Sequence, residues 1–420
     1  MSTTAVRGLE PASIGSYDRR GSSRAGAIEA PDLNREQIRQ RWRMGVEARA
    51  LVVVTAVLLA FGLAVLYSAS ALVAMQEGKG GAFYLLRQLS GVAGGAVAFA
   101  VAAKVDAGRL ERGAWPLMGL AILLMLLTVL PFTESVAPRI NGSRRFLLGG
   151  SLQPSELSKL AVIVWTAMLL VKKKANGSLR RLSKGLFPFL LVVGVLDVLA
   201  ALEPDLSVAM MFTLIMGIVL FAGGVRIGHF IALGVLATPV LWHEVERLQY
   251  VFLRMVAFLD PGGAPSEVNY QLKQSLVAVG SGGWLGVGFG EGRQQAGFLP
   301  YPYSDFIGSN VGEEWGFVGI TVLTLVYALY GWLGFRIARQ ARSEFLRLVA
   351  VGLTVTMVLT AYLHVGVVIG LLPTTGLTLP FMSYGRSNLV LSLLTTGILV
   401  NIGSERERVV GEHATNPLQP

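Results

Sequence analysis

The carboxylates that could carry chemistry stand close together near one long apolar segment. Asp305 follows Leu299-Pro300 and precedes this apolar segment, and Glu313 and Glu314 lie within it about two turns later. A carboxylate at a membrane face is costly unless it has a partner or a function. Aspartate before an apolar helix is also a favoured N-cap. The position of Asp305 therefore fits a functional carboxylate and a helix cap equally well.

Basic residues that could bind an anionic ligand occur earlier in the chain. Arg139, Arg144 and Arg145 lie in one gap between apolar segments, and Lys159 follows early in the next segment. Arginine and lysine form charge-assisted hydrogen bonds with phosphate and carboxylate oxygens. Interfacial snorkelling, with the apolar stem in lipid and the charge in water, is the other explanation. Both an anion site and an interfacial role are open for these residues.

Several standard chemistries lack their motifs in this sequence. No Walker A run occurs, so the chain does not resemble an ATP-driven pump. The four histidines have no metal-ligand spacing, and the absence of cysteine excludes disulfides, Fe–S clusters and thiolate zinc sites. The glycines of Gly286–Gly290 lack the strand and helix that flank a phosphate loop. We therefore predict no metal site and no nucleotide-binding loop.

The composition predicts a membrane protein. Of 420 residues, 53% are hydrophobic and 15% are charged, and the mean hydropathy is +0.58. Soluble domains carry roughly 25% charged residues, and no single soluble core could bury so much apolar sequence. The net charge of +10 would suggest a nucleic acid partner only for a soluble protein. In a membrane protein the side on which the charge lies matters more, so no nucleic acid partner is predicted.

The apolar residues form about ten continuous runs that can cross a bilayer as helices, which predicts an all-α polytopic fold. These runs cover residues 50–71, 84–103, 114–132, 155–171, 187–202, 206–222, 227–243, 308–335, 346–371 and 377–402. A cytoplasmic N-terminus places most basic connecting residues in the cytoplasm, as the positive-inside rule requires. Both termini are then cytoplasmic.

The connecting segments and tails complete the predicted organisation. Residues 1–49 are predicted to be a disordered basic cytoplasmic tail with a short helix near Arg35–Arg49, and residues 404–420 a cytoplasmic C-terminal tail. Between them lies one transmembrane domain over residues 50–403. Its loop 244–307 is by far the longest outer connection, and long loops in compact proteins are usually functional or disordered. The aromatic residues of this loop favour an ordered, membrane-associated structure outside the cytoplasm.

Short motifs along the apolar part resemble the SEDS family, which comprises FtsW, RodA and SpoVE. Each motif is modest by itself, and their order and spacing over residues 50–403 make the resemblance specific. The motifs are Asn141-Gly-Ser-Arg-Arg145, Gln153-Pro-Ser-Glu-Leu-Ser-Lys159, Glu203-Pro-Asp-Leu206, Leu259-Asp-Pro261, Tyr270-Gln271, Gln274-Ser275, Gly280-Ser-Gly-Gly283, Leu299-Pro300, Ser304-Asp-Phe-Ile307, Gly312-Glu-Glu314, Leu372-Pro-Thr374 and Gly376-Leu-Thr-Leu-Pro-Phe-Met-Ser-Tyr-Gly385.

The resemblance implies a peptidoglycan glycosyltransferase that polymerises lipid II on the outer face of the cytoplasmic membrane. The essential aspartate of the family falls on Asp305, which would act as the catalytic base. The pyrophosphate leaving group departs as an anion, so one base and nearby cations suffice for the reaction. The implied substrate-binding residues are Arg144, Arg145, Lys159, Gln274, Ser275, Ser383 and Tyr384. No organic cofactor is implied, and a divalent cation stays open.

The chain departs from the family pattern at several positions. Tyr303-Ser304 stands where the family usually has His-Thr, Gly308 replaces the usual phenylalanine, and Arg386 replaces a glycine, within the last apolar run. Thr378 stands where elongation members usually have proline, which favours the division member, FtsW. The isolated polar residues Asp197 and His364 lie inside apolar runs and are expected to face the bundle interior.

The resemblance also implies partners and a location. The expected partners are lipid II (undecaprenyl-pyrophosphate disaccharide-pentapeptide), a single-pass class B penicillin-binding transpeptidase and other divisome proteins. The expected location is the bacterial cytoplasmic membrane at the division septum. The alternatives are an elongation polymerase of the RodA type, a lipid II transporter and a non-enzymatic scaffold of the division complex. No inverted repeat with matching broken helices is visible, which counts against a transporter.

Overall fold

A computed structural model describes residues 38–133, 136–138, 143–177, 185–231, 234–235, 238, 242, 249–259 and 266–410. Contacts divide the chain into two units, Met1–Arg41 with Arg406–Pro420 and Trp42–Glu405. Strand β1 (Ile38–Met44) pairs with strand β2 (Ser404–Val410). The prediction of a short helix near Arg35–Arg49 is therefore wrong for residues 38–44, which form a strand. Arginine at every second position of β1 has the period of a strand and not that of a helix.

The larger unit is built of apolar helices, which confirms the predicted all-α membrane fold. Within the described residues, six helices are long and apolar enough to cross a membrane: α1 (Val46–Gln76), α2 (Phe83–Lys104), α3 (Arg109–Val129), α4 (Pro154–Ala175), α11 (Ile307–Arg339) and α12 (Glu344–Val368). Three shorter apolar helices accompany them: α6 (Phe187–Leu202), α7 (Leu206–Ala222) and α13 (Arg386–Ile402). Eight of the 17 residues in the run 227–243 lie outside the described residues, so the count of ten spans stays a prediction.

The last apolar run differs from its predicted extent of 377–402. Helix α13 begins only at Arg386, so Arg386 is the first residue of this helix and does not lie inside a span. Residues 372–385 form a loop, in which Gly376 and Phe381 have left-handed φ values of 72° and 66°. The cause is local, because left-handed residues and Pro380 cannot continue a helix. This loop borders the candidate site described below.

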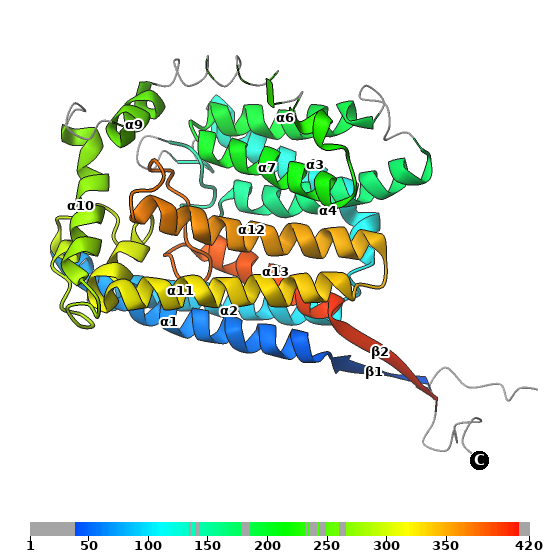
Figure 1. The fold of residues 1–420 in the computed structure, drawn as a ribbon, viewed down its shortest axis with the longest axis horizontal. Coiled ribbons are helices and arrows are strands. Elements are labelled where there is room, and N and C mark those ends of the chain that lie inside the picture. The colour runs from blue at the N-terminus through cyan, green and yellow to red at the C-terminus, as the bar shows by residue number, and fades with distance from the viewer. Residues whose placement is uncertain are drawn as a thin grey trace, which may run out of the picture. The chain divides into compact units, whose positions relative to one another are not determined.

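The helices of the larger unit lie side by side (Figure 1). Helices α4, α12 and α13 each contact several of the others. Large side chains fill the core between them, among them Trp165, Tyr327, Tyr330 and Phe212. Helix α4 is apolar around almost its whole circumference over its middle turns, and a helix with that pattern is buried. The ends of these helices thereby become fixed relative to one another, and the candidate site is built on such ends.

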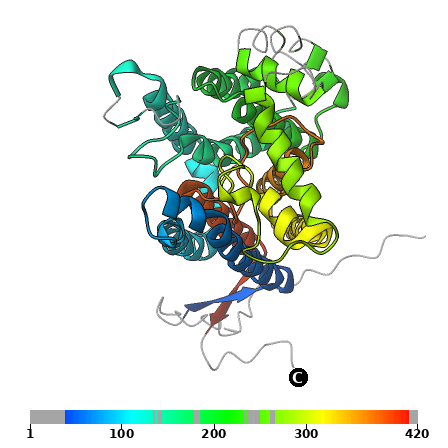
Figure 2. The ribbon, with the colours of Figure 1, turned by 90° about the vertical axis from the view of Figure 1, so that its left-hand side faces the viewer.

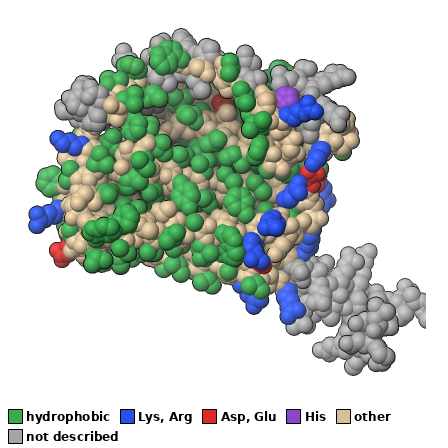
Figure 3. All heavy atoms as spheres, in the orientation of Figure 1, with side chains coloured by type: hydrophobic (Ala, Val, Ile, Leu, Met, Phe, Trp, Pro, Cys, Tyr) green, Lys and Arg blue, Asp and Glu red, His purple; other side chains and the backbone are tan. Residues whose placement is uncertain are grey.

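One face of the molecule shows the surface that a bilayer requires. Hydrophobic side chains cover its middle, and lysine and arginine side chains gather along one edge (Figure 3). Exposed apolar side chains on α1 and α11 include Val53, Val57, Leu325 and Trp332. Lipid can cover such side chains, whereas water would leave a large unfavourable apolar area. The basic edge agrees with the prediction that basic residues gather on one side of the membrane.

The described part of residues 244–307 contains helices α9 (Gln249–Leu259) and α10 (Ser266–Gly282) and the short 3₁₀ helix η4 (Gln294–Ala296). Helix α10 packs against α11 and α12 (Figure 2). The segment after α10 joins α11 where that helix is interrupted at Gly316, whose φ is 65° and ψ is −160°. There the N–H groups of Val287 and Phe317 donate to the carbonyls of Glu313 and Gly283 at 3.0 and 2.8 Å. The backbone bonds lost at the break are thus replaced.

Candidate active site

Asp305 lies in a tight turn that leads into α11. Tyr301 at the start of the turn has a left-handed φ of 52°, which is uncommon for a residue other than glycine. The three carbonyls before Asp305 each accept a hydrogen bond from another segment: Pro302 from the Asn310 amide at 2.7 Å, Tyr303 from the Tyr384 N–H at 2.9 Å, and Ser304 from the Ser383 hydroxyl at 2.7 Å. These bonds hold the turn in one conformation.

The structure separates the two interpretations of Asp305. The N-cap residue of α11 is Phe306, and it makes no side-chain capping bond. Among the described residues, the Asp305 carboxylate accepts a hydrogen bond only from the Ser304 hydroxyl, at 3.0 Å. Asp305 therefore does not cap α11, and the explanation of this residue as a helix cap is wrong. The carboxylate is half-buried and retains most of its capacity to accept hydrogen bonds.

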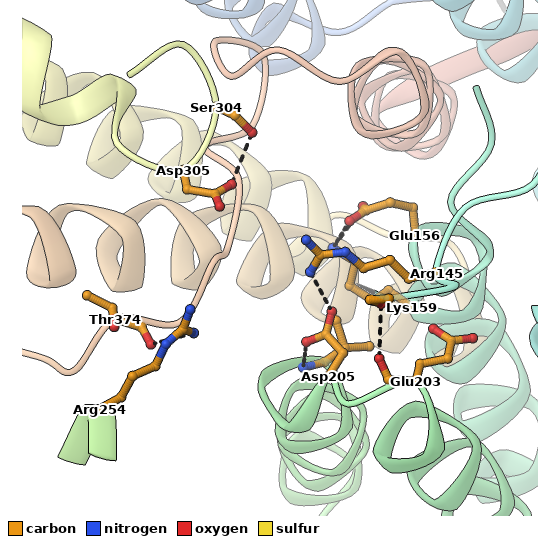
Figure 4. A network of polar contacts seen from close by, with 11 residues as sticks. Arg145, Glu156, Lys159, Glu203, Asp205, Arg254, Ser304, Asp305 and Thr374 are labelled. Atoms are coloured by element: carbon orange, nitrogen blue, oxygen red, sulfur yellow. Dashed lines mark hydrogen bonds and ion pairs between the residues drawn. The ribbon is translucent and has the colours of Figure 1, made fainter. Parts of the chain in front are cut away.

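Two arginines act on the charge of Asp305 from opposite sides of the site. Arg145 lies before α4 and Arg254 lies on α9, and both guanidinium groups point toward the region of Asp305 (Figure 4). Burial raises the pKa of Asp305, while the Ser304 hydroxyl and the two arginines partly offset this rise and Asp205 adds to it. A carboxylate with a raised pKa is a stronger base than a solvated one.

Arg254 was missed by the sequence analysis. Its Nη1 donates to the carbonyl of Thr374 at 3.3 Å, which joins α9 to the loop before α13 (Figure 4). The signal was present in the sequence, because Arg254 is the single charge of the apolar helix Gln249–Leu259. An isolated charge in an apolar helix at a membrane indicates a function or a partner.

The turn between α6 and α7 supplies two further carboxyl groups. Asp205 caps α7 by accepting the Val208 N–H at 3.2 Å, and it also pairs with Arg145 at 3.5 Å. Burial raises the pKa of Asp205, and Arg145 lowers it in part. Burial raises the pKa of Glu203 to about 8, although a hydrogen bond from Thr128 opposes this rise. Glu203 is therefore mostly neutral at pH 7 and does not repel an anion held by Arg145.

The other two predicted cations are engaged within the protein. Arg144 donates to the carbonyl of Leu130 at the end of α3, at 3.3 Å. Lys159 is buried and pairs with Glu156 at 2.8 Å, one turn earlier on α4. This pair lines a small cavity of about 30 Å³ between α4, α12 and α13, together with polar side chains that include Asn388. The cavity is large enough for water.

The remaining predicted residues surround the site at different depths. Ser383 is buried and accepts the Leu379 N–H at 2.8 Å in addition to its bond to Ser304. Ser275 is fully buried and donates to the carbonyl of Val368 at 2.8 Å. Both hydroxyls hold backbone segments in place here, so their contact with a substrate stays a prediction.

Gln274 and Tyr384 are both half-buried, and they lie on different sides of the site. Gln274 lies on α10 beside the fully buried Ser275. The Tyr384 ring packs against Tyr84 and Tyr303 at centroid distances of 5.1 and 5.7 Å. A substrate contact stays a prediction for both residues.

The two glutamates within α11 bind backbone and side-chain groups of the protein. Glu313 is buried and accepts the N–H groups of Arg293 and Gln294 at 2.8 and 3.2 Å. Glu314 is buried and accepts the Ser68 hydroxyl of α1. Glu313 therefore anchors the segment before Asp305 to α11, and Glu314 anchors α1 to α11. Arg386 likewise connects α13 to the segment before α4, since it donates to the Ser151 hydroxyl.

Together these contacts define a helical polytopic membrane protein with one activated carboxylate between two arginines, at a place where several helices begin. Among the described residues, no group of three or more histidine, aspartate or glutamate side chains is arranged to hold a metal ion. The arrangement can remove a proton from a neutral hydroxyl group and can bind a multiply charged anion beside it.

A family model for FtsW, RodA and SpoVE, described as cell cycle protein, matches residues 49–408, and the chain belongs to this family. The chain is 35% identical to the "Probable peptidoglycan glycosyltransferase FtsW" of Trichlorobacter lovleyi, over 88% of this chain and 96% of that protein. It is also 35% identical to the stage V sporulation protein E of Bacillus subtilis, over 84% and 95% of the two chains.

Solved structures extend these similarities to the fold. A chain of a peptidoglycan synthase complex, described as coordinating polymerization and crosslinking, is 26% identical with a TM-score of 0.70 and covers 84% of this chain and 97% of its own. The rod shape determining protein RodA of Thermus thermophilus is 26% identical with a TM-score of 0.58, over 84% and 95% of the two chains.

Proposed function

We propose that this protein is a peptidoglycan glycosyltransferase that polymerises lipid II into glycan strands at the outer face of the cytoplasmic membrane. The observation that carries the proposal is the half-buried carboxylate of Asp305, whose pKa is raised, with Arg145 and Arg254 acting on it. The substrate class comes from the relatives, because the FtsW proteins that this chain resembles are named peptidoglycan glycosyltransferases.

The proposed reaction needs one proton acceptor and one anion site. Asp305 takes the proton of a sugar hydroxyl, and this oxygen then attacks the anomeric carbon of a second lipid-linked saccharide. The bond between that carbon and the pyrophosphate breaks, and the pyrophosphate carries the electron pair away. Because it leaves as an anion, it needs charge stabilisation and no proton. Arg145 and Arg254 supply that stabilisation through charge-assisted hydrogen bonds.

Contacts with other parts of the fold hold the two arginines in place for binding a pyrophosphate. Arg145 is held by Asp205 at 3.5 Å, and Arg254 is held by the Thr374 carbonyl at 3.3 Å. A guanidinium has five N–H donors, and the bond of Arg145 to Asp205 uses one of them. The raised pKa of Glu203, about 8, favours its neutral form and reduces the negative charge near Arg145. Arg144 and Lys159 act at the margin of the site, through their positions beside Arg145.

The proposal includes the orientation and the surroundings of the protein. Residues 1–49 and 404–420 lie in the cytoplasm as tails of the transmembrane domain 50–403, and the segment 244–307 lies outside. The relatives named FtsW support a role in septal wall synthesis during division. A class B penicillin-binding transpeptidase is the proposed partner, because the similar chain of known structure belongs to a synthase complex for polymerization and crosslinking.

The test is polymerisation of lipid II by the full chain purified in detergent, with glycan strands separated by gel electrophoresis. We expect wild-type protein to make strands and Asp305→Asn to make at least about 100-fold less. A transporter would move labelled lipid II across vesicle membranes and make no strands, so that result would refute the enzyme. Gathering of the tagged protein along the cell cylinder instead of midcell would refute the septal role.

A further inference from the structure

A buried histidine on α12 links two segments that border Asp305. His364 is 1% exposed, and both nitrogens of its ring have hydrogen-bond partners. The N–H of Gly308 donates to Nε2 at 3.2 Å, and Nδ1 lies 2.8 Å from the carbonyl oxygen of Leu377. A backbone N–H can only donate, so Nε2 is the acceptor and Nδ1 carries the proton that is donated to Leu377. The imidazole is therefore neutral and of one tautomer.

The two partners of this ring belong to opposite sides of the Asp305 carboxylate. Gly308 follows Asp305 by three residues, in the first turn of α11. Leu377 follows Gly376, and a Cβ atom at Gly376 would lie 3.8 Å from Oδ2 of Asp305. The single ring of His364 thereby joins the first turn of α11, which follows the carboxylate in the chain, to the loop that lies close to it.

The ring of His364 packs tightly against Gly308, which has no side chain. A Cβ atom at Gly308 would lie 3.2 Å from both Nε2 and Cδ2 of His364 and 3.3 Å from Val368. Glycine is otherwise unfavourable in a helix. Gly308 is also a position where the chain departs from the family pattern.

We propose that His364 is a positioning residue for the glycosyl transfer, and this inference rests on the proposed function. By holding Gly308 and Leu377, it fixes the position of Asp305 relative to the loop before α13, where Gly376 lies close to the carboxylate. His364 itself contacts no substrate. A displacement of about 1 Å of a catalytic group can cost about 100-fold in rate.

The test uses purified variants with separate kcat and KM for lipid II, melting temperature and the pH profile of kcat/KM. His364→Leu removes both bonds, His364→Asn can keep the donor to Leu377, and His364→Gln can keep the acceptor for Gly308. We expect kcat to fall about 10- to 100-fold in His364→Leu, and less in the other two. KM should change little, because binding groups are untouched.

The pH profile distinguishes positioning from simple support of the fold. If the loop moves away from Asp305, water reaches the carboxylate, which reduces the effect of burial and lowers the raised pKa. The acid limb of the profile should therefore move to lower pH in His364→Leu. The groups that bear on this limb are Ser304, Arg145, Arg254 and Asp205, and none of them is substituted in the variants.

A second substitution keeps the proposal testable if His364→Leu does not fold. Gly308→Ala leaves the histidine intact but pushes its ring, and it should lower kcat in the same manner. Gly119→Ala on α3 is the matched control, because a Cβ atom there meets nothing within 4 Å. It should behave as wild type. Unchanged kcat and an unchanged acid limb in Gly308→Ala and the His364 variants would overturn the proposal. If wild-type protein makes no glycan in this assay, the proposed function fails instead.

Discussion

Replacing Asp305 by asparagine separates the chemistry of this carboxylate from its structural contacts. The variant keeps the size of the side chain and can still accept the Ser304 hydroxyl. It loses the ability to take a proton, which is worth about 10²- to 10⁴-fold in rate, or about 3–5 kcal/mol in the barrier. Weakening the Ser304 bond costs at most about 0.5–1.5 kcal/mol of stability. Activity should therefore fall far more than stability.

The raised pKa of Asp305 adds an opposite effect on stability. Burial makes ionisation harder in the folded state, so the folded protein retains this proton to higher pH than the unfolded chain does. Stability then falls as pH rises from the ordinary aspartate pKa of about 3.9 through the raised value. Asparagine does not ionise, so Asp305→Asn should be at least as stable as wild type at pH 7, and its stability should decline less over this window.

Two measurements decide the matter. Initial rates of lipid II polymerisation report the chemistry, and melting temperatures between about pH 4 and 8 report the stability over the range in which this carboxyl group should ionise. The acid limb of the wild-type rate profile should lie above the ordinary aspartate range, since the base must lose its proton first. Full activity in Asp305→Asn would refute the reasoning. A melting temperature well below wild type at pH 7 would refute the argument from burial.

Four other substitutions lead to testable predictions. Arg145→Ala should lower the polymerisation rate about 10- to 150-fold, because a charge-assisted bond contributes about 1.5–3 kcal/mol. Its melting temperature should stay near wild type, since the pair of Arg145 with Asp205 is partly exposed. Arg144→Ala should lower both the rate and the melting temperature, because it loses the bond to Leu130. Wild-type rates in both variants and in their double mutant would contradict the anion site. Glu313→Ala should lower the free energy of unfolding by about 1–3 kcal/mol for each backbone N–H left without a partner, as measured by thermal or denaturant unfolding, and an unchanged midpoint would exclude its role as an anchor. A cysteine placed at Ser178 should resist impermeant reagents added outside cells, and labelling there would reverse the predicted orientation.

The sequence predicted the helices well where apolar runs were long and uninterrupted. The run 377–402 was predicted too long, because Leu377, Leu379 and Phe381 have the hydropathy of a span. Their conformation is decided by Gly376 and Pro380 and by the contacts of the loop with Asp305. Hydropathy measures transfer to lipid and does not report such backbone conformations.

The site was predicted in part. Asp305 and Arg145 lie in recognisable motifs, so they could be identified before the fold was known. Arg254 enters the site through a contact with Thr374, 120 residues away in the chain. His364 has no local sign beyond its polarity, because its partners come from α11 and from the loop before α13. Long-range contacts of this kind follow from helix packing, which a single sequence does not contain.

The break in α11 sets the depth at which the reaction takes place. With a rise of 1.5 Å per residue, the part after Gly316 is about 34 Å long, enough by itself to cross a hydrocarbon layer of about 30 Å. The part before Gly316 is about 14 Å long, and in the proposed orientation it lies at the outer boundary. Asp305 precedes that part, so this orientation predicts that it lies at the level of the lipid headgroups. A polyprenyl chain can then stay dissolved in the bilayer while its pyrophosphate reaches the carboxylate, and no part of the glycan has to enter hydrocarbon.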